Sequence, residues 1–316
     1  MTTLLHVFIM LTSSLQSYQN FHFSIFSVAM LYTPEVKQAK MPTNTHLEDG
    51  IVQALPPNIN QHVYRGLRYF WSFVTQEQTH FDDDKTRSHS QYMLFTNINH
   101  ETFTHDFNIC HHKPSWHLVD TYFPHSQQLL IRTSTFKDHE RAQAGLVNIM
   151  LTKLAAMNGA NMSLDWTGSA EIHAPSCIKK ADQTFAPRNI PHGRSDVWPT
   201  LIIQSSFIES RLKLRADAKW WLTESKGDVK TALVICVHRR EAEIIIQKWE
   251  SPIVKQEVVV SSLDGKSEPV VRNGPLVVSF QKLFLRLPNY REGDIVFTDD
   301  DLGEIAKMVW EKQEFI

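Results

Sequence analysis

Two short apolar runs on either side of a predicted helix constrain the fold of this chain more than any other feature. Thr200–Gln204 and Thr231–Val237 are mostly apolar, which is typical of strands that are buried on both faces of a sheet. Between them, Glu209–Glu224 repeats apolar residues at helical spacing, and Gly227 follows its end. Strands buried on both faces need helices above and below them. The order therefore predicts an α/β fold with a mixed central sheet flanked by helices.

The surrounding sequence supplies further elements of that architecture. Apolar spacing predicts a helix over His139–Met157, which Asn158 and Gly159 end, and a closing helix over Asp299–Lys312, which Thr298 caps. Five other segments have the composition of strands: Ser169–His173, Lys179–Phe185, Glu243–Trp249, Glu257–Ser262 and Leu276–Phe284.

The first 130 residues lack this regular alternation, so we divide the chain into three parts. Residues 1–41 have no Asp, Glu, Lys or Arg before Glu35, and we expect an unstructured extension or a mispredicted start, with Met30 or Met41 as the first residue. A targeting leader needs basic residues near its start, so we do not expect one here. The apolar runs Leu4–Leu11 and Phe23–Leu31 are both shorter than the roughly 18 residues of a membrane span. Residues 42–130 predict an irregular His-rich flank, and 131–316 the folded domain.

The charge balance and the cysteines exclude several classes of protein. The chain has 32 basic and 34 acidic residues, a formal net charge of −2, so no strong overall field attracts nucleic acid. Cys110, Cys177 and Cys236 are too few and too scattered for a disulfide framework. An odd cysteine count suits a reducing compartment. We therefore expect an intracellular protein of the cytoplasm or nucleus, with no membrane contact.

Two predicted strands end in polar residues that could hold a metal ion. Lys179–Gln183 contains Asp182, and Leu201–Ser206 contains Gln204. If the strands lie side by side, the two side-chain oxygens could share one Mg²⁺, which takes one or two carboxylates, water and a phosphate oxygen. Such an ion would orient a water and neutralise the charge that develops on a phosphodiester.

The residues around these strands resemble those of a group of nucleases. The segments that carry the resemblance are Asp182–Pro187, Trp198–Ile203, Glu209–Ser210, Leu214–Ala218, Trp220–Leu222, Gly274–Leu276, Leu283–Arg286 and Ile305–Trp310. In order and spacing they are similar to uncharacterised fungal proteins with a restriction-endonuclease-like core, within the PD-(D/E)XK nuclease superfamily. The resemblance covers about residues 131–316 and leaves the first 130 residues outside.

The resemblance implies a core in which an Asp and a Glu on neighbouring strands hold Mg²⁺ and a Lys positions or deprotonates the attacking water. Asp182 matches the Asp, whereas Gln204 stands in the place of the Glu and Ser206 in that of the Lys. In other branches of the superfamily the Lys comes from the following helix. Lys213 and Lys219 are both candidates here, and the sequence does not choose between them.

The glutamine weakens the expected metal site. A glutamine oxygen can still coordinate Mg²⁺, but it brings no negative charge to offset that of the ion. We therefore expect low affinity at Asp182 and Gln204, with Glu171 from a neighbouring strand or Glu140 from the first helix as possible additional ligands.

The helix over Glu209–Glu224 has a basic face and an apolar face. Its basic residues could contact a nucleic-acid backbone, although a soluble helix exposes charges in any case, and we favour a solvated face. These residues are Arg211, Lys213, Arg215 and Lys219. Leu214, Ala218 and Trp221 form one apolar stripe with Leu212 and Trp220 beside it, which predicts core tryptophans rather than a base-stacking surface.

A dense group of potential zinc ligands lies in the His-rich flank. Its members are His100, His105, Cys110, His111, His112 and His117. Closed zinc sites use paired ligands two to four residues apart, whereas five-residue steps dominate this group. We expect a polar flank, and a structural zinc site is the alternative.

Two functions of different classes follow. The first is a nuclease-like domain with a degraded metal site and weak or lost Mg²⁺-dependent phosphodiester hydrolysis. The alternative is a non-catalytic interaction or scaffold module, a pseudo-nuclease that keeps the fold. Loss of activity in Asp182→Ala and a gain in Gln204→Glu would support the enzyme.

Overall fold

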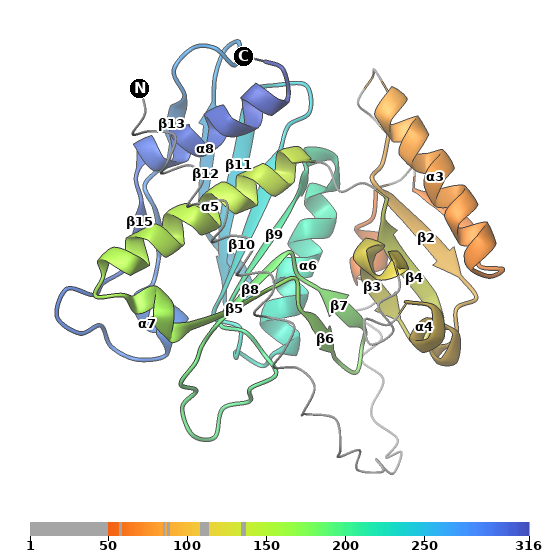
Figure 1. The fold of residues 1–316 in the computed structure, drawn as a ribbon, viewed down its shortest axis with the longest axis horizontal. Helices are drawn as coiled ribbons and strands as arrows, with labels where there is room; N and C mark the ends of the chain where they lie inside the picture. The colour runs from red at the N-terminus through yellow and green to blue at the C-terminus, as the bar shows by residue number, and fades with distance from the viewer. Residues whose placement is uncertain are drawn as a thin grey trace, which may run out of the picture. The chain divides into compact units, whose positions relative to one another are not determined.

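A computed structural model of the chain describes residues 50–56, 59–84, 86, 89–107, 114–133 and 137–315, and only the backbone of 137–139 (Figure 1). All of them belong to one compact unit, residues 43–316. The expectation for residues 1–41 lies outside the described residues. Of the helices that are described, none is both long enough and apolar enough to cross a membrane.

The larger sheet, here called sheet B, has seven strands in the order β13-β12-β11-β10-β9-β8-β5. Its strands are β5 Leu164–Gly168, β8 Gln183–Pro187, β9 Leu201–Phe207, β10 Thr231–Val237, β11 Glu243–Glu250, β12 Ile253–Ser261 and β13 Val270–Arg272. β9 and β10 are parallel, with Thr231 opposite Leu201, and the other pairs are antiparallel. The mixed sheet is confirmed.

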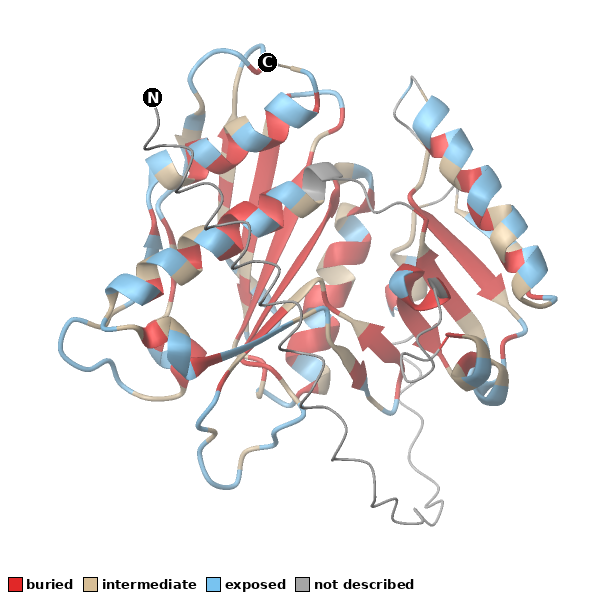
Figure 2. Cartoon of the chain, in the orientation of Figure 1, coloured by how far each residue is buried: buried red, intermediate tan, exposed pale blue. Residues whose placement is uncertain are grey.

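Helices cover both faces of sheet B (Figure 1). Helices α5 (Lys137–Ala156) and α8 (Asp299–Lys312) lie on one face, and α6 (Arg211–Glu224) lies on the other. Alternate residues of β9 divide between the two layers. Leu201 and Ile203 pack in the cluster of α5 and α8, whereas Ile202 packs in that of α6. Figure 2 shows β9 and β10 buried along their length, as the flanked-sheet prediction requires.

The second sheet, sheet A, has six strands in the order β1-β2-β4-β3-β7-β6. They are β1 Asn60–Val63, β2 Tyr92–Thr96, β3 Val119–Phe123, β4 Gln128–Arg132, β6 Glu171–His173 and β7 Ile178–Lys180, and only β1 and β2 are parallel. Helices α3 (Leu67–Asp83) and α4 (His100–Phe107) pack on one face. The other face packs in the cluster that contains α6, so α6 contacts both sheets.

The prediction of an irregular flank over 42–130 is wrong for the described residues. They form α3, α4 and four strands of sheet A, and β4 crosses the predicted boundary at residue 130. These strands have only four or five residues. β2 and β3 are also buried on both faces, so they show no alternation from which a strand could be predicted.

Two further predictions needed correction. Leu276–Phe284 is not one strand, because β14 (Leu276–Val278) ends at Ser279, whose hydroxyl caps the short helix α7 (Phe280–Phe284). β14 pairs instead with β15 (Ile295–Phe297).

Leu212 is 68% exposed and lies outside the apolar stripe of α6, whereas Leu214, Ala218, Trp220 and Trp221 are buried as predicted. The described residues also contain three short 3₁₀ helices, η2 Pro114–Leu118, η3 Ala160–Ser163 and η4 Ile208–Ser210.

The segment predicted as one strand over Lys179–Phe185 is broken at Ala181 and Asp182. β7 before the break belongs to sheet A, and β8 after it belongs to sheet B. Ala181 and Asp182 are in neither strand, so Asp182 lies where the chain passes from one sheet to the other.

The predicted cap of the closing helix is confirmed and gives a first test of the fold. The Thr298 hydroxyl accepts the Asp301 N–H, and the Asp301 carboxylate accepts the Thr298 N–H at 2.7 Å. Thr298→Ala is expected to lower the free energy of unfolding by about 1 kcal/mol, measured by urea denaturation. Thr298→Ser keeps the hydroxyl and should retain most of the stability. Equal loss in both variants would contradict the cap.

Candidate active site

A cavity of about 240 Å³ lies beside the passage from sheet A to sheet B. Five charged side chains line it, from β3, β4, α5, β7 and the break between β7 and β8. They are Asp120, Arg132, Glu140, Lys180 and Asp182. Three carboxylates and two cations therefore meet in one cavity, at the place where the chain passes from sheet A to sheet B.

Asp182 is held firmly at the edge of this cavity. One carboxylate oxygen, Oδ2, accepts the Ser205 N–H at 2.7 Å and the Ser205 hydroxyl at 3.2 Å. The other, Oδ1, pairs with Arg132 at 3.2 Å. β8 pairs with β9 so that Gln183 is opposite Ile203, which brings Asp182 to the backbone of Ser205. The carboxylate is therefore oriented before any ligand binds.

Glu140 supplies a second carboxylate near that of Asp182. Among the described residues it makes no hydrogen bond and no ion pair. Burial raises its pKa above the ordinary value, and the negative charge of Asp182 raises it further, with Arg132 acting in the opposite direction. Two carboxylates that repel each other across a cavity would both be stabilised by a cation between them.

Lys180 provides an amine with altered acidity. Its Nζ donates to the Trp116 carbonyl at 3.0 Å and lies 4.2 Å from the centre of the Trp116 ring. Burial lowers the pKa of Lys180 to about 8, although the carboxylate of Glu171 opposes the change. This amine loses its proton more readily than an exposed lysine does.

Arg132 links two of the cavity's carboxylates. Its Nη1 lies 3.2 Å from Asp182, and its Nη2 lies 3.5 Å from Asp120. The guanidinium therefore already neutralises part of the negative charge that a metal ion would otherwise meet.

Behind the cavity, four buried charges form an ionic cluster between sheet A and α6. Its members are Asp120, Lys179, Lys213 and Asp217, of which the last three are 0% exposed. Lys213 lies 2.5 Å from Asp120 and 2.7 Å from Asp217, and Lys179 lies 2.7 Å from Asp217. Burial favours a raised pKa for Asp120, but Lys213 and Lys179 outweigh it and the net shift is downward. The cluster is electrically balanced.

The structure does not bring Gln204 into the cavity with Asp182. Gln204 is 0% exposed and lies on the α6 face of β9, the face that Ile202 shares. Its Nε2 donates to the Lys180 carbonyl at 3.4 Å, and its Oε1 is buried without a partner among the described residues. Asp182 instead shares the cavity with Glu140, the helix residue predicted as an additional ligand.

The other predicted site residues lie elsewhere. Lys213 is committed to the ionic cluster, so its ammonium does not line the cavity. Lys219 is exposed on α6 and does not line the cavity either. Glu171 pairs through Oε1 with His173 and faces Lys180 across the β6–β7 pair. The lysine that does line the cavity is Lys180.

The basic face predicted on α6 is smaller than expected. Lys213 has no exposed surface and cannot contact a nucleic-acid backbone. Arg211 pairs with Glu257 at 2.7 Å, and the Arg215 guanidinium lies 5.6 Å from the Trp249 ring. A contact with phosphates through this helix would rest on Arg211, Arg215 and Lys219.

The His-rich group is divided in the structure. His100 and His105 lie on α4, His117 lies in η2 and lines the cavity, and Cys110, His111 and His112 are outside the described residues. His105 pairs with Asp106 at 2.7 Å.

Sequence reasoning missed Asp120, Arg132 and Lys180 as members of the site. Asp120 lies in β3, within the stretch predicted to be irregular. Arg132 lies in β4, which crosses the predicted domain boundary. Lys180 lies two residues before Asp182 in the sequence. Lys179 and Lys180 are neighbours on β7 and point to opposite faces, so one is in the buried ionic cluster and the other lines the cavity, and no sequence signal distinguishes the two.

Comparison with known proteins found likeness among solved structures. No family model matches the chain, and no curated protein matches it. Among solved structures, a candidate nuclease belonging to DUF820 from Anabaena variabilis is similar, with 11% sequence identity and a TM-score of 0.36. The likeness covers 60% of this chain and 92% of that protein.

Proposed function

We propose that the cavity is a weak, divalent-cation-dependent phosphodiesterase site. In this proposal Asp182 and Glu140 hold the cation and Lys180 acts on the attacking water. The observation that carries it is the carboxylate of Glu140, which lines the cavity near Asp182 and has no hydrogen bond or ion pair among the described residues.

The two carboxylates fit Mg²⁺ or Mn²⁺. Hard cations prefer carboxylate oxygens, and Mg²⁺ commonly takes one or two of them, with water and a substrate phosphate as the other ligands. Each carboxylate oxygen can accept more than one contact. Asp182 can therefore hold the Ser205 N–H and a cation together. The sequence resemblance supports the same role, because Asp182 matches the metal-binding Asp of the nuclease superfamily.

The reaction is hydrolysis of a phosphodiester. Lys180, as the free amine, accepts a proton from a water whose oxygen bonds to phosphorus, while the bond to the leaving ester oxygen breaks and that oxygen takes a proton from solvent. The cation, when bound, neutralises the charge that develops on the phosphate. Arg132 keeps the Asp182 carboxylate in place through its 3.2 Å contact.

Two features support weak rather than efficient hydrolysis. Arg132 contacts both Asp120 and Asp182, so a positive charge already lies near the proposed ion. Position 204 has a neutral, buried glutamine in place of the Glu that the resemblance implies. Both features lower the expected affinity for a divalent cation.

A cleavage assay with a metal-binding measurement tests the proposal. The full chain is incubated with labelled single- and double-stranded DNA and RNA in Mg²⁺ or Mn²⁺, and Mn²⁺ affinity is measured by electron paramagnetic resonance. Asp182→Asn and Glu140→Gln are each expected to lower cleavage and Mn²⁺ affinity at least tenfold, about 1.4 kcal/mol. Glu209→Gln, an exposed acid outside the cavity, is the matched control.

Gln204→Glu tests whether Asp182 shares the cation with Glu140 or with residue 204. Because Gln204 is buried against the Lys180 carbonyl, a carboxylate there is expected to lower the melting temperature without raising cleavage. A gain in cleavage would mean that position 204 reaches the ion. A parent chain that neither binds Mn²⁺ nor cleaves any substrate would refute the enzyme.

The bridging position of Arg132 favours a second candidate, a non-catalytic module. There the guanidinium between Asp120 and Asp182 would serve as a permanent cation that stabilises the fold. If the chain is such a module, it should not bind Mn²⁺, and Glu140→Gln should have no effect. The proposed enzyme predicts the opposite on both counts.

A further inference from the structure

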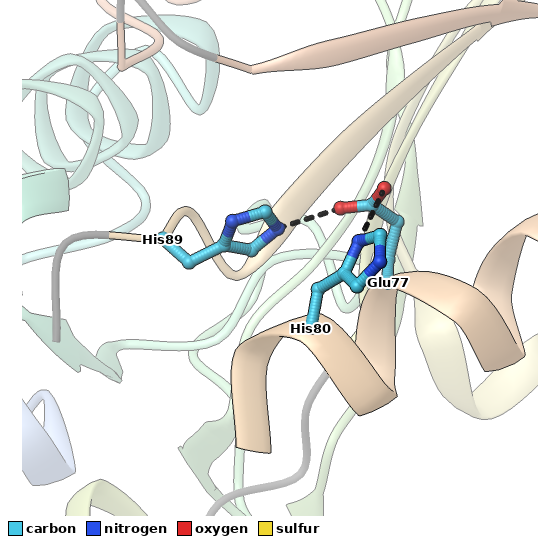
Figure 3. Close-up of side chains that lie close together, drawn as sticks. All are labelled: Glu77, His80 and His89. Atoms are coloured by element: carbon cyan, nitrogen blue, oxygen red, sulfur yellow. Dashed lines mark hydrogen bonds and ion pairs between the residues drawn. The ribbon is translucent and has the colours of Figure 1, made fainter. Parts of the chain in front are cut away.

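A second group of potential metal ligands lies on α3, on different residues from those of the cavity. Glu77 and His80 are on the helix, and His89 follows its end. Figure 3 shows the carboxylate of Glu77 next to both imidazole rings. One ligand atom from each residue lies within 4.8 Å of the other two, and no other group of this kind occurs within the part of the chain that the structure describes.

The local sequence brings these three side chains together. Glu77 and His80 are three residues apart, so they project from one face of α3, as in the Glu-x-x-His pairs of helical metal sites. The chain after α3 is held close to the helix end because the Asp84 carboxylate accepts the His89 N–H at 2.6 Å. Arg239 donates to the His89 carbonyl at 3.4 Å. The position of His89 is thus fixed from two sides.

The chemistry of the group suits a metal ion of intermediate softness. Glu77 is only 6% exposed, and both of its ion-pair partners are histidines. His89 Nε2 lies 2.7 Å from one carboxylate oxygen, and His80 Nδ1 lies 3.8 Å from the other. Burial favours a raised pKa for Glu77, but hydrogen bonds from His89 and Asn60 stabilise its carboxylate and lower the pKa overall. A neutral imidazole brings no full positive charge, whereas a divalent ion would bring one and would also use the imidazole nitrogens.

We propose that Glu77, His80 and His89 bind one Zn²⁺, through one carboxylate oxygen and two imidazole nitrogens, with the fourth position open to water. Two histidines and one glutamate are a ligand set of zinc sites that keep an open position, and imidazole disfavours Mg²⁺ and Ca²⁺. The half-exposed side chain of His80 gives that position access to solvent.

The geometry needs only side-chain movement. Ligand atoms at about 2.0–2.2 Å from a tetrahedral zinc ion lie roughly 3.4 Å apart. His89 and Glu77 are closer than this and His80 is farther away. Rotation of the 51% exposed His80 side chain closes that gap without moving the backbone of α3. The bound ion would fasten the end of α3 to the segment that leads into β2.

Zinc competition on the full chain tests this inference. The protein is stripped with a chelator and titrated with Zn²⁺ against a chromophoric chelator, and Co²⁺ is used as a spectroscopic probe of a nitrogen and oxygen ligand set. The parent is expected to bind one equivalent of Zn²⁺ that His80→Asn and His89→Asn each bind at least tenfold more weakly. Zinc should also raise the melting temperature of the parent more than that of either variant.

Matched controls keep the result interpretable. His105→Asn removes an exposed helical histidine that pairs with one acid, Asp106, and should not change the zinc stoichiometry. Asp182→Asn alters the cavity and should leave zinc binding intact, so failure of the proposed hydrolysis does not affect this site. Because His80 is exposed, its substitution should preserve the fold. Equal zinc affinity in the parent and His80→Asn, or equal loss in His105→Asn, would overturn the inference.

Discussion

Replacing Asp217 with asparagine is expected to lower the free energy of unfolding by about 3–5 kcal/mol. Asp217 is 0% exposed, and it lies 2.7 Å from Lys179 and 2.7 Å from Lys213. Without its charge, two buried ammonium groups share the single carboxylate of Asp120. Urea denaturation followed by tryptophan fluorescence measures the loss.

A double variant shows whether the loss comes from unbalanced charge. Lys179→Met with Asp217→Asn removes one charge of each sign and should be less destabilising than the sum of the two single changes. The partly exposed pair of Arg211 and Glu257 is the comparison, and Glu257→Gln should cost less than about 1 kcal/mol. Strict additivity in the double variant would contradict a coupled cluster.

Replacing Lys180 with methionine is expected to slow the proposed hydrolysis by roughly 10²–10⁴-fold, the usual contribution of a positioned acid or base. Lys180 is the lysine of the cavity that Asp182 and Glu140 also line. Methionine keeps an apolar contact with the Trp116 ring, so the fold should be preserved. Single-turnover cleavage in Mn²⁺ gives the rate, and Mn²⁺ affinity should change little because the carboxylates remain.

Two other lysine substitutions define what Lys180 does. Lys180→Arg keeps the charge but cannot act as a base near neutral pH, so partial activity would indicate that the side chain positions the water. Lys219→Met removes the exposed alternative and should cleave like the parent. If Lys180→Met cleaves at the parent rate while Lys219→Met is slow, the role assigned to Lys180 is wrong.

The second half of the fold could be predicted from sequence because its elements are long or strongly patterned. The predicted strand Thr231–Val237 and the predicted helix Asp299–Lys312 have the bounds of β10 and α8. Helix periodicity and the Thr298 cap are local signals, which the chain carries whatever it packs against.

The elements that could not be predicted depend on tertiary contacts. The strands of sheet A are short, and β2 and β3 are buried on both faces, so their pattern has no period. The break at Ala181 is set by the pairing of β7 and β8 in different sheets, which composition does not encode. Leu276–Phe284 has apolar residues at both ends, and the cap at Ser279 separates its strand from its helix.

The candidate site was predicted in part. The sequence points to Asp182 and Glu140 as candidate ligands, and both line the cavity. Lys213 was named for the attacking water, but its ammonium lies between Asp120 and Asp217. Asp217 is a local i,i+4 neighbour of Lys213, but Asp120 is 93 positions away, so the sequence of α6 does not show that Lys213 is buried between two acids.

Lys180 and Asp182 are two residues apart in the chain, yet one ends a strand of sheet A and the other precedes a strand of sheet B. In the proposed enzyme, each side chain that takes part in hydrolysis is therefore anchored in a different sheet, or scaffold, and α6 contacts both. A slight slippage of one scaffold against the other would misalign base and carboxylate while every hydrogen bond within the sheets survived. For the proposed hydrolysis, correct docking of the two scaffolds would therefore matter as much as the identity of the reacting side chains.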